Sequence, residues 1–210
     1  MVGMENELQK AVKHLCRRDP MLAPVIIRCG LATFVPHRDY YRSLTDSIIG
    51  QQLSVKAAAS IKHRFRELFG GEFPKPTAIL EKSIEELRGV GLSGAKANYI
   101  RDLAEHILDG RVTFAHLDQQ TNEEIIAELT DVKGIGEWTV HMFLMFCMGR
   151  LDVLPTGDLG IRNGIRNLYG YTDTPSPSQV KELAARNHWH PYESVASWYI
   201  WESYDSTPLG

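Results

Sequence analysis

The sequence has few cysteines and no long apolar run, and both absences narrow the class of protein. Its 210 residues include three cysteines, Cys16, Cys29 and Cys147, which are far apart and odd in number. They predict neither a disulfide framework nor a metal cluster, and they fit a reducing cytoplasm. No stretch approaches the ~20 apolar residues of a membrane span, and the acidic start of the chain lacks the apolar core of a signal peptide.

An excess of basic residues is also missing. The formal net charge is -3 at pH 7, because 26 Asp and Glu outnumber 23 Lys and Arg. This charge argues against a protein that holds nucleic acid through bulk positive charge. It does not exclude an enzyme that acts on nucleic acid, because backbone amides and helix N-termini can hold phosphates.

The alternation of apolar and polar residues that marks a half-buried strand is absent as well. Apolar positions recur at helical spacing along nearly the whole chain, and capping boxes at 83–86 and 121–124 mark the starts of two helices. The Asp19-Pro20 pair predicts a capped helix that runs to Cys29. The stretch from Glu137 to about Met148 is apolar on most sides, which is typical of a central helix. We therefore predict an all-α fold.

The stretch Lys133-Gly-Ile-Gly-Glu-Trp138 predicts a tight turn between two helices. Glycine permits a positive φ and a close approach of another backbone. Gly136 lies at the N-terminus of the second helix, where free amides and the helix dipole favour an anion such as a phosphate. An isolated Gly-x-Gly is more often a plain turn, but Trp138 and the downstream Pro-x-x-Asp ending at Asp158 favour a nucleic-acid site.

With these residues in place, the chain resembles the helix-hairpin-helix DNA glycosylases, and specifically the 3-methyladenine DNA glycosylase II family. The resemblance covers roughly residues 38–203 and rests on five stretches that together are highly specific. These are Gly50-Gln-Gln-Leu-Ser-Val-Lys56, Gly89-Val-Gly-Leu-Ser93 with Lys96, Lys133-Gly-Ile-Gly-Glu-Trp-Thr139, Leu154-Pro-Thr-Gly-Asp158-Leu, and Ser197-Trp-Tyr-Ile-Trp201.

The resemblance implies two helical lobes with a DNA cleft between them. The central lobe would span 38–150 and end in the helix-hairpin-helix motif at about 122–148, and residues 1–37 plus 151–210 would form the second lobe. Better-known members carry an additional N-terminal β-rich domain. Only about 37 residues precede the shared region here, so we expect the helical core alone.

The resemblance also assigns roles to individual residues. Asp158 matches the catalytic aspartate. The base pocket would use Trp138, Trp201 and Met142, and either Gln52 or Leu53 would fill the gap left by the extruded base. The clamp on the DNA backbone would comprise Lys133, Gly134, Ile135, Gly136 and Thr139. The backbone carbonyls of Thr130, Val132 and Ile135 would hold a monovalent cation, Na⁺ or K⁺, and the chemistry itself would require no cofactor.

A single carboxylate suits the chemistry that the resemblance implies. Cleavage of an N-glycosidic bond develops positive charge on the sugar, which a carboxylate near C1′ can stabilise while it orients the attacking water. A purine alkylated at N3 or N7 already carries a positive charge and leaves as a neutral base, so Asp158 needs no partner acid. Electron-rich rings such as Trp138 and Trp201 attract such a base. The alternative role of Asp158 is a plain helix N-cap, and that of the tryptophans is core packing, which we expect for Trp189 and Trp198.

Two further absences sharpen the subclass. Glycosylases that also cut the strand carry a lysine two residues after the second hairpin glycine, where Trp138 stands here, so we predict no lyase activity. The four-cysteine iron–sulfur loop of other branches is missing. Met142 replaces a pocket tyrosine of some relatives, and Gly157 replaces a second acidic residue. These changes leave open whether 1-methyladenine or 3-methylcytosine is accepted.

The sequence thus predicts a monofunctional DNA glycosylase that removes alkylated bases, such as 3-methyladenine and 7-methylguanine, in base excision repair. Its partner would be double-stranded DNA that contains alkylated bases, without a membrane, and we expect a monomer in the bacterial cytoplasm or a eukaryotic nucleus. Two alternatives stay open. One is a glycosylase for another lesion, such as a deaminated purine, and the other is a non-catalytic helix-hairpin-helix DNA-binding protein.

Overall fold

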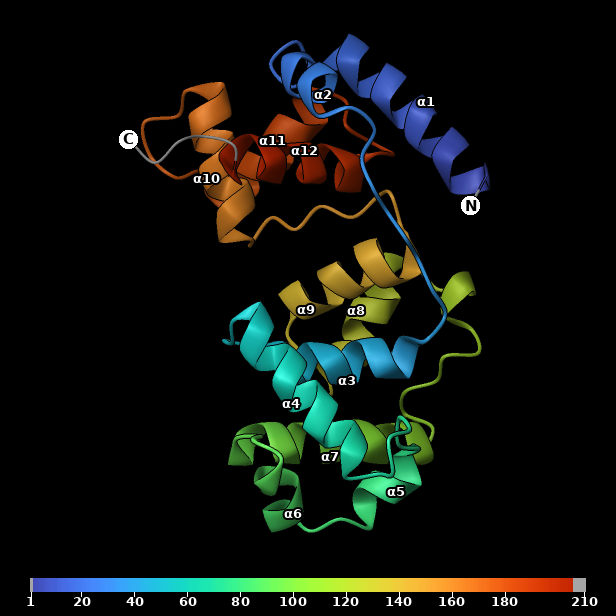
Figure 1. Cartoon of the computed structure of the whole chain (residues 1–210). Helices are drawn as coiled ribbons and strands as arrows, with labels where there is room; N and C mark the ends of the chain where they lie inside the picture. The colour runs from blue at the N-terminus through green and yellow to red at the C-terminus, as the bar shows by residue number, and fades with distance from the viewer. Residues whose placement is uncertain (1, 206–210) are drawn as a thin grey trace. The chain divides into compact units, whose positions relative to one another are not determined.

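The computed structural model describes residues 2–205, and helices are the only regular secondary structure in that range (Figure 1), as predicted. None of the helices in residues 2–205 has both the length and the apolar character that a membrane crossing requires. The helices are α1 Val2–Arg18, α2 Ala23–Cys29, α3 Tyr40–Gly50, α4 Val55–Glu67, α5 Pro76–Leu80, α6 Ile84–Gly89, α7 Gly94–Leu108, η1 Leu117–Gln119, α8 Asn122–Thr130, α9 Glu137–Met142, η2 Phe143–Met148, α10 Leu159–Tyr169, α11 Pro177–Arg186 and α12 Glu193–Asp205.

The chain divides into two compact units. The central unit is the continuous segment His37–Phe143, and the terminal unit combines the chain up to Pro36 with the chain from Leu144 onward. Residues 144–150, which the sequence analysis assigned to the central lobe, group with the terminal unit.

The central unit has a core built from the apolar faces of its helices. α3 packs on both α4 and α7, and α5 packs on α7. Ile48, Ile49, Phe65, Ile100 and Leu103 are almost completely buried. The capping boxes predicted at 83–86 and 121–124 are both present and start α6 and α8. The turn with Gln52 and Leu53 follows α3, and the glycine hairpin follows α8, so both turns with predicted DNA-binding residues extend from helices of this unit.

The terminal unit corrects one predicted helix start. α2 begins at Ala23 rather than at Asp19-Pro20. The Asp19 carboxylate instead accepts hydrogen bonds from the backbone N–H groups of Met21 and Leu22, which closes a turn before the helix. It is fully buried and also binds three side chains from the C-terminal part of the chain. These are the Tyr169 hydroxyl, the Asn187 amide and the Trp189 indole N–H, at 2.5, 2.9 and 2.7 Å.

The helix after the glycine hairpin also differs from the prediction. An α-helix extends from Glu137 to Met142, and the chain continues as a π-helix from Phe143 to Met148. The six residues of this π-helix are all apolar, so the sequence has no polar–apolar periodicity that could separate the two helix types. The prediction that this stretch is mostly buried is confirmed, because Val140, Phe143, Leu144, Met145 and Cys147 are all in the core.

Candidate active site

Asp158 and Trp201 meet in the terminal unit. Asp158 is the N-cap of α10, as predicted, and its Oδ1 accepts a hydrogen bond from the backbone N–H of Ile161 at 2.7 Å. The same oxygen accepts a hydrogen bond from the indole Nε1–H of Trp201 at 3.0 Å. Both side chains are half-buried. Two N–H donors from different helices thus fix the orientation of one carboxylate.

Two glycines of α10 explain how Trp201 reaches Asp158. A Cβ atom added at Gly160 would lie 3.1 Å from Asp158 Oδ1 and from the Trp201 ring, and one added at Gly164 would lie 2.6 Å from the Ile200 side chain. A larger residue at either position would therefore push α12 away from α10. Neither glycine was predicted as a site residue, although their spacing of four residues on one helix was a usable signal.

Two phenylalanines extend the aromatic surface beside Trp201. The ring centroid of Phe146 lies 6.1 Å from that of Trp201, and Phe34 stacks on Phe146 with a centroid distance of 5.6 Å. Phe146 is 37% exposed, so part of its ring is open to solvent. Neither phenylalanine was predicted as a site residue. Trp189 packs in the core and donates to Asp19, as expected for a structural tryptophan.

The other predicted pocket residues lie together in the central unit. Trp138 and Met142 line a recess of about 580 Å³ with Gln52 and Leu53. Ser47, Gly50, Gln51 and Thr139 complete its wall. Trp138 is 53% exposed, so a large aromatic ring faces solvent at the edge of the recess. The structure therefore groups the two predicted base-pocket residues of this unit with the two predicted gap-filling residues.

The turn that carries Gln52 is strained and firmly held. Gln52 has a φ of 56°, in the left-handed region that few residues other than glycine adopt. The Lys96 ammonium donates to the backbone carbonyls of Ile49 and Gln51 at 2.8 and 2.6 Å, which closes the C-terminal end of α3. Burial lowers the pKa of this Lys96 ammonium. The Gln51 side-chain amide donates to the carbonyl of Gly134 at 2.7 Å and so connects this turn to the glycine hairpin.

Within the hairpin, Gly134 allows a close approach that no other residue permits. Its φ is 81°, and a Cβ atom added there would lie 2.1 Å from the ring of Tyr99. Real Cβ contacts are never that short, so the Tyr99 ring packs directly on the bare glycine backbone. Gly134 was predicted as a site residue, but Tyr99 was not, because it lies on α7, far from the hairpin in the sequence.

Asp102 on α7 holds the hairpin at Lys133. Its carboxylate accepts from the Lys133 backbone N–H at 2.9 Å and from the Lys133 ammonium at 3.1 Å. Burial opposes ionisation of Asp102, but the hydrogen bonds from Lys133 prevail and lower the pKa of the carboxyl. Asp102, which was not predicted from the sequence, thus holds the hairpin in place. The Lys133 ammonium is hydrogen-bonded to its carboxylate.

Gly136 is the opposite case from Gly134. Its φ is -94°, and a Cβ atom added there would meet nothing within 4 Å. It is the N-cap of α9, and no side chain caps the helix there. The first amides of a helix lack partners inside the helix, so this exposed end can take hydrogen-bond acceptors from outside.

The carbonyls predicted to hold a monovalent cation have the right chemistry for it. In residues 2–205, no backbone N–H donates to the carbonyls of Thr130 or Ile135, and the Val132 carbonyl accepts one hydrogen bond, from Ile135 at 3.1 Å. Carbonyl oxygens with remaining lone pairs are ligands that Na⁺ and K⁺ accept. No cluster of three or more His, Cys, Asp or Glu side chains in the described part of the chain could hold a metal.

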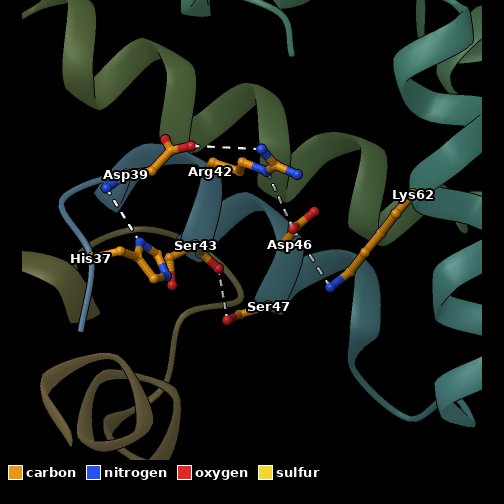
Figure 2. Close-up of a pocket in the computed structure, with 7 residues that line it drawn as sticks. All are labelled: His37, Asp39, Arg42, Ser43, Asp46, Ser47 and Lys62. Atoms are coloured by element: carbon orange, nitrogen blue, oxygen red, sulfur yellow. Dashed lines mark hydrogen bonds and ion pairs between the residues drawn. The ribbon is translucent and has the colours of Figure 1, made fainter. Parts of the chain in front are cut away.

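A second, more polar recess of about 600 Å³ follows α3 away from the Gln52 turn (Figure 2). Asp46 lies near its centre, with Arg42 Nε at 3.8 Å and Lys62 Nζ at 3.7 Å. Burial raises the pKa of Asp46, and the attraction of Lys62 and Arg42 does not fully offset it. None of the residues that line this recess was predicted as a site residue. Its remaining lining residues are His37, Asp39, Ser43 and Ser47.

Two helices joined by a glycine hairpin, followed by an aspartate-capped helix, define a helix-hairpin-helix protein. Residues 45–188 match the HhH-GPD superfamily of base excision DNA repair proteins, and the chain belongs to this superfamily. It is 36% identical to DNA-3-methyladenine glycosylase 1 of Schizosaccharomyces pombe, over 94% of this chain and 88% of that protein. It is 29% identical to the alkylbase DNA glycosidase-like protein mag2 of the same yeast, over 96% of both chains.

Solved structures show the same relationship. The chain is similar to DNA-3-methyladenine glycosidase from Bacillus halodurans, with a TM-score of 0.84, 38% identity, and coverage of 93% of this chain and 89% of that one. It is also similar to the S. pombe 3-methyladenine DNA glycosylase in complex with abasic DNA, with a TM-score of 0.78, 34% identity, and coverage of 92% and 95%.

Proposed function

We propose that this protein is a DNA glycosylase that hydrolyses the N-glycosidic bond of alkylated bases in base excision repair. The observation that carries the proposal is the Asp158 carboxylate, which two N–H donors hold in one orientation beside an aromatic ring. The named relatives are glycosylases for 3-methyladenine or alkylated bases, and they support the choice of substrate class. Its DNA partner would be a duplex with an extruded, alkylated nucleotide.

Asp158 would act on the sugar rather than on the base. As the glycosidic bond lengthens, positive charge develops at C1′, and a carboxylate fixed nearby stabilises it without reorganisation. The same carboxylate can orient the attacking water. A base alkylated at N3 or N7 departs as a neutral molecule, so no acid is needed to protonate it, and no cofactor takes part in the step.

Aromatic rings would select the base by its charge. The half-exposed ring of Trp138 borders a recess of about 580 Å³ that also includes Met142, a soft and polarisable side chain. A cationic base gains cation–π attraction on such a ring, whereas a neutral base does not. Gln52 and Leu53, both exposed at the edge of this recess, would occupy the gap that the extruded base leaves in the duplex.

The glycine hairpin would bind the DNA backbone. The uncapped start of α9 at Gly136 suits a phosphate oxygen, and Thr139, Ile135 and Lys133 belong to the same turn. A monovalent cation held by the carbonyls of Thr130, Val132 and Ile135 would add a positive charge at the phosphate.

We also propose that the enzyme is monofunctional and acts as a monomer. Strand cleavage through a Schiff base requires an amine near the sugar, and Trp138 occupies the hairpin position where such glycosylases carry lysine. The Lys133 ammonium is bound to Asp102 and belongs to the hairpin itself. The product would therefore be an abasic site in an intact strand.

The second candidate is a non-catalytic DNA-binding protein, in which Asp158 is only a helix N-cap. The carboxylate does fill that role, because it accepts the Ile161 N–H. The exposed aromatic ring of Trp138 at a recess disfavours this candidate, because a protein that only clamps the backbone needs no pocket for a base.

Asp158→Asn separates the two candidates. Asparagine is also a good N-cap, and its side-chain oxygen can accept the same N–H groups, so the fold should persist. Single-turnover release of 3-methyladenine from methylated DNA should fall at least about a hundredfold, while the melting temperature and the affinity for lesion DNA change little. Release at the wild-type rate would show that Asp158 is structural. The absence of any release by the wild-type protein would favour the DNA-binding candidate.

A further inference from the structure

Ser47 lies in the wall of the recess that contains Trp138 and Met142. It is a half-buried residue of α3, one turn before the Gln52 turn, and it also borders the polar recess of Figure 2. A serine hydroxyl in the wall of a recess that holds a cationic base takes no part in cation–π attraction. Its hydroxyl therefore needs a separate explanation.

The hydrogen of this hydroxyl is already committed. Ser47 Oγ donates to the backbone carbonyl of Ser43 at 2.8 Å, one helical turn earlier (Figure 2). A hydroxyl has one hydrogen and two lone pairs, so Ser47 can offer the recess only an acceptor. Gln51, which lines the same recess, likewise directs its amide nitrogen to the Gly134 carbonyl.

We propose that Ser47 determines specificity by accepting a hydrogen bond from the exocyclic amino group of an extruded, cationic N-alkylpurine. This inference rests on the proposed glycosylase function. The positive charge of an alkylated ring strengthens its N–H donors, and a hydrogen bond to such a charged group is stronger than one between neutral groups. Trp138 attracts the face of the base whatever groups lie on its edge. Ser47 thereby adds selection for a base whose edge carries an amino donor.

The test compares two lesions that differ by one amino group. Duplexes with a single 7-methylguanine or a single 7-methylhypoxanthine are incubated with enzyme at mildly acidic pH, where both bases keep their positive charge. Ser47→Ala should lower kcat/KM for 7-methylguanine about tenfold or more, the loss expected for a hydrogen bond to a charged group. For 7-methylhypoxanthine, kcat/KM should stay within about twofold, because that base has no amino group to lose a partner.

Ser43→Ala is the matched control. It removes the same hydroxyl from the same helix, but Ser43 lines only the polar recess, and the backbone carbonyl that Ser47 uses remains. Both substitutions introduce the best helix former, so both variants should melt near the wild-type temperature. Ser43→Ala should keep the wild-type ratio between the two bases.

The outcomes separate the two proposals. If the wild type releases neither base, this inference fails, and the release of 3-methyladenine from methylated DNA decides separately whether the proposed function stands. If the wild type releases 7-methylguanine but Ser47→Ala lowers release of both bases equally, or of neither, then Ser47 does not read the amino group and the glycosylase proposal stands. The same holds if Ser43→Ala changes the ratio as much as Ser47→Ala does.

Discussion

Replacing Gly134 with alanine should displace the hairpin from Tyr99 and lower the free energy of unfolding, although the change adds only one methyl group. The new Cβ would lie 2.1 Å from Tyr99 Cδ2 and 2.4 Å from Cγ, so the ring or the hairpin must move. The backbone also stands at φ 81°, where an L-residue costs about 1–2 kcal/mol. Overpacking adds about 1–3 kcal/mol. The sum, about 2–5 kcal/mol, is a large fraction of the stability of a typical domain.

Gly136→Ala provides a matched comparison two residues away. That position has a φ of -94° and open space around the added Cβ atom. The loss of a preferred N-cap residue and the gain from a less flexible unfolded chain oppose each other, so the net change should be within about 1 kcal/mol. Urea unfolding of the two variants, followed by circular dichroism, measures both values.

Removal of the Tyr99 ring should partly rescue Gly134→Ala. Tyr99→Ala costs stability alone, but it removes the ring that Gly134→Ala strikes, so the double variant should lose less than the two single losses combined. Equal destabilisation by Gly134→Ala and Gly136→Ala would refute the assignment of different roles to the two glycines. Strict additivity in the double variant would show that Tyr99 is not the obstacle.

Two further predictions concern other sites in the structure. Gly160→Ala places a Cβ atom 3.1 Å from both Asp158 Oδ1 and Trp201 Nε1, so base release should fall about tenfold. A gain in helix propensity of about 1 kcal/mol should keep the melting temperature near that of the wild type. Release kinetics and a thermal melt measure the two effects, and an unchanged release rate would contradict the prediction. Asp46→Asn should raise the melting temperature at neutral pH, because burial raises the pKa of the Asp46 carboxyl and the folded state disfavours its charge. A folded-state pKa above the unfolded value means that the wild type regains stability as the pH falls through the carboxyl range. The advantage of the variant should therefore fade toward about pH 3, and an advantage that grows in acid would count against this account.

Local rules in the sequence predicted much of the fold. The capping boxes, the all-α class and the start of α10 at Asp158 each depend on residues within one turn of each other, where spacing alone carries the signal. The pattern also identified Trp138 and Gln52 through the resemblance, and the structure places both at one recess. Such rules failed at Asp19. The Asp19-Pro20 pair predicted a helix start there, but α2 begins at Ala23, and the Asp19 carboxylate binds buried side chains such as Trp189.

Contacts between distant residues could not be read from the sequence. Gln51 binds Gly134 across 83 positions, and Asp102 binds Lys133 across 31. Each contact fixes a turn that the sequence identified only as a turn. Periodicity gives the face of a helix but not the residue opposite it, so Tyr99 and Asp102 carried no signal until α7 was placed against the hairpin.

The buried carboxylate of Asp19 has a consequence for the order in which this chain acquires structure. Its side-chain partners Tyr169, Asn187 and Trp189 follow it by 150, 168 and 170 positions. On the ribosome, residues 37–143 emerge as one uninterrupted segment and can assemble early, since domains generally fold as units. Until the chain has been synthesised through Trp189, Asp19 lacks its full set of side-chain partners, although the backbone N–H groups of Met21 and Leu22 can already donate to it. A truncated chain that ends before Trp189 would therefore expose this carboxylate and the apolar faces of α1 and α2 together, which is the kind of surface that chaperones and proteases recognise.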